Sequence, residues 1–185
     1  REAQDFDVAT DAPAAEVQQL FPRTIPVGVQ FGVVVVLMDN EPVEVATFRS
    51  DSIYVDGRHP SSVHFSSPVE DAQRRDFTIN GMFLDPVTDT VIDYVGGRDD
   101  LRAGIIRAIG DPQARISEDR LRMLRAVRFA ARLRFDIEPR TFAALQANAA
   151  SITDIAWERI GDEIVRILTD SESGSARRGF ELLYI

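Results

Sequence analysis

Residues 27–48 read VGVQFGVVVVLMDNEPVEVATF, and this stretch decides the fold class. Two runs rich in β-branched residues, 27–38 and 43–48, are separated by the turn-forming sequence Asp39-Asn40-Glu41-Pro42. Such a pattern predicts two strands joined as a hairpin. We therefore expect a β-sheet at this point of the chain.

The sequence on either side predicts strands before residue 110 and helices after it. Besides the hairpin, we expect short strands at 5–9, 77–84 and 91–94, and a helix at 13–21. From Ser117 onward, the spacing of the apolar residues changes from that of strands to that of helices. The further helices that we expect are one from Ser117, as a cap, to about Leu133, one from Pro139, and one at 157–168. Strands followed by helices predict an α+β protein, with a sheet-containing domain before an all-helical one.

Composition excludes several kinds of site. Among 185 residues there are no cysteines and two histidines, so disulfides, thiol nucleophiles and zinc–cysteine sites are excluded. A reducing cytoplasm is the expected compartment. Carboxylates are abundant and favour magnesium if a metal is bound. No apolar run is long enough to cross a membrane, and we expect no membrane partner.

The net charge of −9 argues against binding nucleic acid by bulk charge. Six arginines and no lysine nevertheless lie between Arg115 and Arg140. This density favours local recognition of phosphates or bases.

Two further expectations concern the ends and one long connection. The sequence has no starting methionine and closes on an apolar stretch, so we expect an internal piece of a longer chain. Residues 50–69 form a long, polar, turn-rich connection, which we expect to be mobile without substrate. The alternative is a surface excursion with a short strand at 62–65.

Three carboxylates are candidates for a metal site. Asp5 and Asp7 share one face of the predicted strand, because alternate residues point the same way. Glu44 lies in an otherwise apolar strand, where a carboxylate needs solvent or a cation. We expect Asp5 and Asp7 on a central strand with Glu44 facing them from a neighbouring one. Such a set can hold two metal ions for phosphoryl chemistry. The alternative is solvated carboxylates on edge strands.

A second candidate group follows at 74–80. Arg74 and Arg75 carry guanidinium groups that match phosphate oxygens, while Asp76 and Asn80 can hold a sugar hydroxyl. The alternative is a surface salt-bridge cluster with Glu70 and Asp71.

The third group lies on the predicted helix 117–133. Asp119 and Arg122, three residues apart, would present an acceptor beside a donor. That pair matches the pairing edges of cytosine and adenine and opposes those of guanine and uracil. The alternative is an ordinary ion pair. A basic stripe continues along the same helix, facing either phosphates or solvent: Arg122, Arg125, Arg128 and Arg132.

Taken in order, six motifs resemble the class II branch of the tRNA nucleotidyltransferase and bacterial poly(A) polymerase family. They are DFDVAT (5–10), EVATFR (44–49), RRDFTIN (74–80), DYVGGRDDL (93–101), EDRLR (118–122) and ERI (158–160). The resemblance extends to about Leu168. It implies a nucleotidyltransferase-type mixed β-sheet head at 1–110, a helical neck at 111–170 and the start of a helical body at 171–185.

The resemblance also implies roles for the candidate residues. Asp5 and Asp7 would bind two catalytic Mg²⁺ ions, with Glu44 as the third acidic residue. Triphosphate and ribose would be held by Arg74, Arg75 and Asp76. Independently of the resemblance, Asn80 and Arg125 are candidates to bind the nucleotide. Asp119 and Arg122 would select the base.

The implied activity is template-independent addition of CCA, or of C and A residues, to tRNA 3′ ends from CTP and ATP. Partners would be tRNA or another RNA 3′ end and nucleoside triphosphates, with no DNA. The alternatives are a poly(A) polymerase or A-adding enzyme of this family, and a degenerate module that binds nucleotide or RNA without turnover. The family's glycine-rich segment before the Asp-x-Asp strand, and its tRNA-holding body and tail, are not in this sequence.

Overall fold

The structure, a computed structural model, describes residues 6–39, 41–51, 63–170, 172 and 174–184. Asp5 and residues 52–62 of the long connection lie outside this range, so the predictions on them are not addressed. The described chain forms two compact units, one up to Arg74 and the other from Arg75 onward. Each is described separately.

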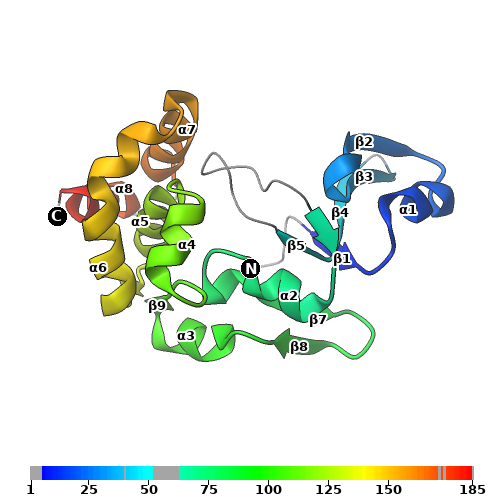
Figure 1. Ribbon diagram of the computed structural model, residues 1–185, viewed down its shortest axis with the longest axis horizontal. Helices are drawn as coiled ribbons and strands as arrows, with labels where there is room; N and C mark the ends of the chain where they lie inside the picture. The colour runs from blue at the N-terminus through cyan, green and yellow to red at the C-terminus, as the bar shows by residue number, and fades with distance from the viewer. Residues whose placement is uncertain (1–5, 40, 52–62, 171, 173, 185) are drawn as a thin grey trace. The chain divides into compact units, whose positions relative to one another are not determined.

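A four-stranded mixed sheet forms the centre of the first unit (Figure 1). Its strands, in spatial order, are β1 (Asp7–Thr10), β4 (Glu41–Thr47), β3 (Val33–Met38) and β2 (Thr24–Gly28). β1 runs parallel to β4, while β3 is antiparallel to both of its neighbours. The α+β class and the mixed sheet are therefore confirmed. The central placement of β1 is wrong, because β1 is the edge strand of this sheet in the described residues.

Helix α1 (Ala14–Leu20) covers one face of this sheet and corresponds to the helix predicted at 13–21. Its buried Ala14 and Val17 pack on Val34, Val36 and Val45. Because side chains alternate along a strand, Val33, Val35 and Glu44 must lie on the opposite face. The register of the strands therefore fixes which side chains lie on the face away from α1.

The continuous strand predicted at 27–38 is wrong. β2 ends at Gly28, a 3₁₀ turn occupies Val29–Phe31, and β3 begins at Val33. Gly32 adopts φ +78°, a conformation that L side chains rarely take, and it closes the turn. The two glycines inside the run were the sequence signal for this hairpin.

The first unit is completed by a small hairpin and a capped helix. β5 (Arg49–Asp51) pairs antiparallel with β6 (Val63–Phe65), which agrees with the alternative of a short strand at 62–65. Helix α2 (Pro68–Gln73) begins with a capping box, in which Ser67 and Glu70 each accept a backbone N–H bond at the helix start.

The second unit begins with small β elements that lead into helices. A 3₁₀ turn at Thr78–Asn80 occupies the first half of the strand predicted at 77–84, which is therefore wrong there. The remaining elements are hairpin β7 (Met82–Asp85)–β8 (Thr90–Asp93), helix α3 (Gly97–Ala103), and the parallel pair β9 (Ile105–Ile106) with β10 (Asp136–Ile137).

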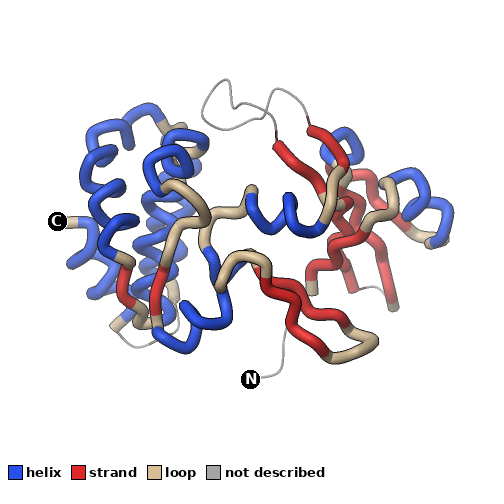
Figure 2. Tube along the Cα trace, turned by 60° about the horizontal axis from the view of Figure 1, so that its bottom comes forward, coloured by secondary structure: helices blue, strands red, loops and turns tan. Residues whose placement is uncertain are grey.

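Helices dominate the rest of this unit, drawn blue in Figure 2. They are α4 (Pro112–Glu118), α5 (Arg122–Leu133), α6 (Pro139–Asn148), the 3₁₀ helix η3 (Ala149–Asp154), α7 (Trp157–Leu168) and α8 (Ser175–Leu183). The helices predicted from Pro139 and at 157–168 are confirmed. No helix in the described ranges is long and apolar enough to cross a membrane.

The single helix predicted from Ser117 to Leu133 is wrong. Asp111 caps α4 by accepting the N–H of Ala114 at 3.0 Å, and Pro112 follows as the first helical residue. Ser117 lies inside α4 and donates back to the carbonyl of Gln113 at 2.9 Å, so it caps nothing. The helix ends because Asp119 is extended, at φ −146° and ψ 106°.

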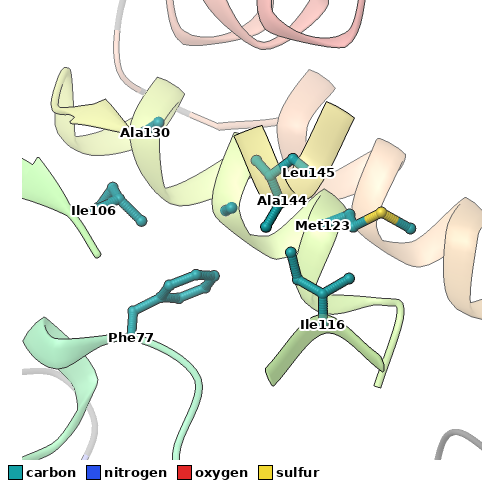
Figure 3. Close-up of a cluster of buried hydrophobic side chains, with 8 residues drawn as sticks. Phe77, Ile106, Ile116, Met123, Ala130, Ala144 and Leu145 are labelled. Atoms are coloured by element: carbon teal, nitrogen blue, oxygen red, sulfur yellow. The ribbon is translucent and has the colours of Figure 1, made fainter. Parts of the chain in front are cut away.

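The core of the second unit joins residues that are far apart in sequence (Figure 3). Phe77 and Ile106 pack with side chains of α4, α5 and α6. The buried alanines Ala130 and Ala144 are small enough for helices to approach closely. Consequently the segment 75–80, with its candidate residues, is attached to the helical part of this unit.

Candidate functional site

Asp7 and Glu44 lie side by side on the sheet of the first unit. They are Cα partners in the parallel register of β1 and β4, and such partners point to the same face. This is the face opposite α1, and both residues are exposed. The predicted juxtaposition of Glu44 with Asp7 is thus confirmed, whereas Asp5 lies outside the described residues.

The chemistry of this pair suits a hard divalent cation. Like charges directly opposite one another on neighbouring strands destabilise a sheet unless something compensates them. Two exposed carboxylates offer the oxygen ligands that Mg²⁺ prefers. In the described part of the chain, no cluster of three or more carboxylates or histidines forms a metal site. The pair is therefore a fitting but partial donor set.

Arg74 is engaged within the first unit. Its guanidinium Nη2 lies 2.8 Å from Oδ1 of Asp71, and its Nε donates to the carbonyl of Arg49 at 3.0 Å. Asp71 is 2 % exposed and also accepts the backbone N–H of Arg49. Arg74 thus pairs with Asp71, as in the salt-bridge alternative, but Asp71 is buried rather than at the surface, and the pair ties α2 to β5.

Asp76 contacts two other candidate residues of the second unit, Asn80 and Arg125. Its Oδ1 accepts Nδ2 of Asn80 at 3.0 Å, and its Oδ2 accepts Nε and Nη2 of Arg125 at 2.7 Å each. Arg75 donates to the carbonyl of Asn80 at 3.0 Å and lies over the ring of Phe83. Asp76, Asn80 and Arg125 form one hydrogen-bonded cluster, with Arg75 beside it.

Each arginine of the basic stripe on α5 pairs with a carboxylate. Arg122 pairs with Glu118, Arg125 with Asp76, Arg128 with Glu163, and Arg132 with Asp170. Arg122 and Arg128 are 8 % and 7 % exposed. The solvated-face interpretation is wrong for these two, because buried guanidinium groups require partners.

Asp119 and Arg122 are not on one helix, contrary to the prediction. Asp119 lies in the connection between α4 and α5, where its Oδ1 accepts the N–H of Leu121 at 3.0 Å and its Oδ2 accepts Nη2 of Arg159 at 2.8 Å. Arg122 begins α5 and donates to the carbonyl of Arg115 at 2.7 Å as well as to Glu118. The two residues stay close through the backbone, since the N–H of Arg122 donates to the carbonyl of Asp119.

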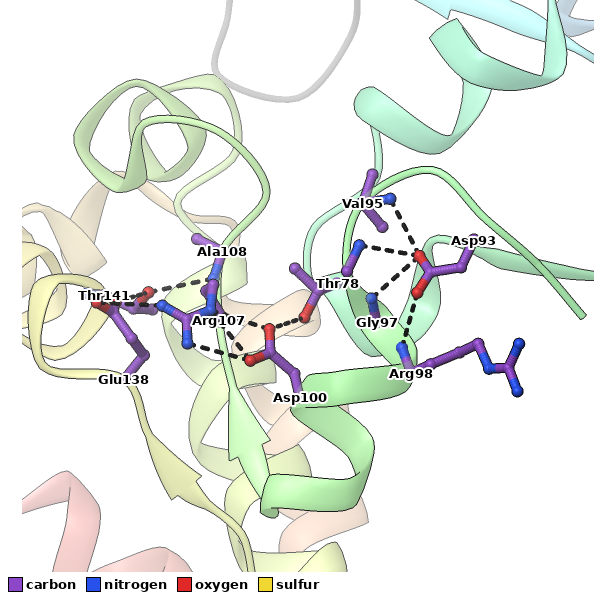
Figure 4. Close-up of polar contacts among 11 residues, drawn as sticks. Thr78, Asp93, Val95, Gly97, Arg98, Asp100, Arg107, Ala108, Glu138 and Thr141 are labelled. Carbon is purple, nitrogen blue, oxygen red and sulfur yellow. Dashed lines mark hydrogen bonds and ion pairs between the residues drawn. The ribbon is translucent and has the colours of Figure 1, made fainter.

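Sequence reasoning assigned no role to Asp93, which organises the start of α3 (Figure 4). Its carboxylate accepts four backbone N–H groups at 2.9–3.1 Å, from Val95, Gly96, Gly97 and Arg98. Burial raises the pKa of Asp93, but the four donors outweigh it and the net pKa is lowered. The signal was present as an aspartate just before Gly96-Gly97.

A second missed group links α3, β9 and α6 through Arg107 (Figure 4). Its guanidinium binds Asp100 at 2.9 Å and lies 3.5 Å from Glu138. Asp100 also accepts the hydroxyl of Thr78 at 2.7 Å, next to the Asp76 cluster. Hydrogen bonding to Asp100 raises the pKa of Arg107 above its usual value. The DYVGGRDDL motif is thus a scaffold that holds the segment carrying Asp76.

Two protein families match the sequence. Residues 1–107 match the poly(A) polymerase head domain. Residues 134–184 match a family described as the probable RNA and SrmB-binding site of polymerase A.

Individual relatives and solved structures agree with one another. The chain is 48% identical to the CCA-adding enzyme of Limosilactobacillus fermentum over 89% of this chain and 41% of that protein. It is 45% identical to that of a Geobacillus species over 99% and 45% of the two chains. The chain therefore spans less than half the length of these relatives.

Among solved structures, the Bacillus stearothermophilus CCA-adding enzyme in complex with CTP matches with a TM-score of 0.88 and 40% identity, over 99% of this chain and 43% of that one. A tRNA nucleotidyltransferase complexed with a primer tRNA and an incoming ATP analogue matches with a TM-score of 0.76 and 29% identity, over 100% and 51%.

Proposed function

The chain belongs to the family of the poly(A) polymerase head domain, and we propose that the protein is a template-independent RNA nucleotidyltransferase that adds C and A to tRNA 3′ ends. The observation that carries this proposal is the placement of Asp7 beside Glu44 on the open face of the sheet. Catalytic carboxylates of a metal-dependent transferase need such a shared, exposed face.

Asp7 and Glu44, with Asp5, are the residues proposed to hold two Mg²⁺ ions. The ions would supply activation of the RNA 3′ hydroxyl and neutralisation of charge on the leaving pyrophosphate. The sheet contributes rigidity, because the register of β1 and β4 fixes the spacing of the two carboxylates.

The cluster around Asp76 is proposed to bind the nucleotide's ribose and triphosphate. Asn80 and Arg125 orient the Asp76 carboxylate, whose Oδ1 also accepts the backbone N–H of Phe77, so a sugar hydroxyl would replace one of these donors. Arg74 and Arg75 are proposed to contact the triphosphate. For Arg74 this role competes with its pairing to buried Asp71.

Asp119 and Arg122 are proposed to select the base, despite the break between α4 and α5. An acceptor on Asp119 and a donor on Arg122 complement cytosine and adenine. The substrates proposed are accordingly CTP and ATP, the nucleotides named with related solved structures. The RNA partner proposed is tRNA, which is bound in the related CCA-adding enzyme of Thermotoga maritima.

Domain roles and location are part of the same proposal. Residues 1–110 would be the catalytic head, 111–170 the neck and 171–185 the start of the body. The absence of cysteine supports a reducing cytoplasm as the compartment.

The proposal is tested by incubating the full-length protein with tRNA lacking its CCA end, Mg²⁺ and each nucleoside triphosphate in turn. We expect incorporation of C and then of A, with little G or U. Incorporation of A alone would indicate the poly(A) polymerase or A-adding alternative. No incorporation, with nucleotide or RNA still bound, would indicate the non-catalytic module.

A further inference from the structure

Helix α7 turns both charged and apolar side chains toward the rest of the second unit. Glu163 and Ile167 are buried at 4 % and 1 % exposure, whereas Trp157 is 73 % exposed. Arg159 precedes Glu163 by four residues and so lies on the same helical face. Arg159 pairs with Asp119 and Glu163 with Arg128 of α5. Ion pairs therefore help to set the orientation of α7, together with the packing of Ile160 and Ile167.

The Arg159–Asp119 pair acts on a residue that no regular helix holds. Asp119 has extended backbone between α4 and α5, so helical hydrogen bonds do not fix its side chain. Two bonds do so instead: the N–H of Leu121 to Oδ1 and Nη2 of Arg159 to Oδ2. Only the second comes from a distant part of the chain. Removing it would leave the carboxylate held only by the local hydrogen bond from Leu121.

The pair is placed where its electrostatic effect is substantial. The side chains of Arg159 and Asp119 are 22% and 18% exposed, so water screens the interaction only in part. Each carboxylate oxygen can accept two hydrogen bonds, so Oδ2 can accept a base amino group while Arg159 remains bound.

We infer that Arg159 is a positioning residue for nucleotide selectivity, which holds the Asp119 carboxylate in the orientation that accepts the amino group of cytosine or adenine. This inference rests on the proposed function. A purely structural role for Arg159 differs from it in one respect: loss of a structural ion pair lowers stability and affects all four nucleotides equally.

The test compares three variants of the full-length protein: Arg159→Ala, Arg159→Lys and the control Arg166→Ala. Arg166 is an exposed arginine of the same helix, so Arg166→Ala changes the net charge by the same amount as Arg159→Ala. The measurements are kcat and KM for CTP, ATP, UTP and GTP on tRNA lacking its CCA end, together with Tm. We expect Arg159→Ala to raise KM for CTP and ATP and to lower the preference for C and A over U and G by roughly tenfold, as loss of one base contact does.

Arg159→Lys should recover part of the preference, because lysine keeps the charge but not the guanidinium geometry. Arg166→Ala should match the wild type throughout. A folded Arg159→Ala protein with an unchanged C/A preference would overturn the inference and leave the proposed function standing. So would an equal loss for all four nucleotides. Wild-type protein that incorporates neither C nor A would instead overturn the proposed function and, with it, this inference.

Discussion

At the scale of single residues, backbone N–H groups and a glycine, which has no side chain, determine which conformations the candidate segments adopt. Asp93 supplies the acceptor for four N–H groups at the start of α3. Gly97, one of these donors, lies against the carbonyl of Thr78. Both residues support the segment that carries Asp76 without taking part in its chemistry.

Replacing Asp93 with alanine should destabilise the protein by about 1–3 kcal/mol at neutral pH, because four backbone donors lose their acceptor. The folded pKa of Asp93 is lowered, so its stabilisation is present above the unfolded pKa of about 3.9 and is lost as pH falls through the folded value. Urea unfolding of both proteins from pH 7 down to 3 measures this. The difference between them should be constant near neutrality and shrink at the acid end.

The control for that experiment is Asp99→Ala. Asp99 makes only a surface pair with Arg102, with side chains 87% and 68% exposed, and its loss should change stability little. An Asp93→Ala protein as stable as the Asp99→Ala protein would show that the N–H groups are equally well satisfied by water.

Two glycine-to-alanine substitutions should have opposite effects. A Cβ at position 97 would lie 2.2 Å from the carbonyl oxygen of Thr78, so Gly97→Ala must displace backbone and should destabilise by more than about 1 kcal/mol. Gly161 lies inside α7 with nothing within 4 Å of an added Cβ. Gly161→Ala should therefore stabilise by about 0.5–1 kcal/mol. Denaturant midpoints report both, and two shifts of the same sign would contradict this account.

At the scale of elements, the sequence predicted helices and strands well where local signals act alone. Helix α7 has the predicted bounds, α6 begins at the predicted Pro139, and α1 begins at Ala14, one residue after the predicted Pro13. Predictions failed where distant contacts override the local pattern. The 117–133 pattern is helical throughout, yet the pairing of Asp119 with Arg159, 40 residues away, accompanies a break. The 77–84 run is interrupted because Thr78 bonds Asp100 and packs on Gly97.

The arrangement of the candidate residues was only partly predictable from the sequence. The expectation that Glu44 faces Asp7 from a neighbouring strand agrees with the register of β1 and β4. The arginine stripe was visible, but the carboxylates that pair with it were not, since they come from four different segments. Spacing along one helix carries no information about partners supplied by others.

The buried pair of Arg128 and Glu163 should be the strongest contact between α5 and α7. Glu163→Gln leaves Arg128 buried without a counter-charge and should cost about 3–5 kcal/mol. The exposed Glu158→Gln, in the same helix, should cost little. Thermal unfolding of the Glu163→Gln and Glu158→Gln proteins measures this difference in stability. A double variant, Arg128→Met with Glu163→Leu, should regain most of the loss, and failure to do so would indicate that the pair also fixes packing geometry.

At the scale of the whole molecule, the two compact units carry different parts of the proposed chemistry. The first contains Asp7 and Glu44 on a sheet whose other face α1 covers. The second contains the Asp76 cluster and the segment with Asp119 and Arg122. The proposed metal ligands thus lie in the first unit, and the proposed nucleotide-binding residues other than Arg74 lie in the second.

The most direct test of the central claim is the single-turnover rate of CTP incorporation by Asp7→Asn, with tRNA lacking its CCA end and saturating Mg²⁺. We expect a rate reduced more than about a hundredfold, beyond the loss typical of residues that only support a metal ligand. Stability should be unchanged or slightly higher, because repulsion with Glu44 is relieved. Glu41→Gln, which removes an exposed carboxylate elsewhere on β4, should retain the wild-type rate. An Asp7→Asn protein that incorporates C at the wild-type rate would contradict the assignment of this carboxylate pair to catalysis.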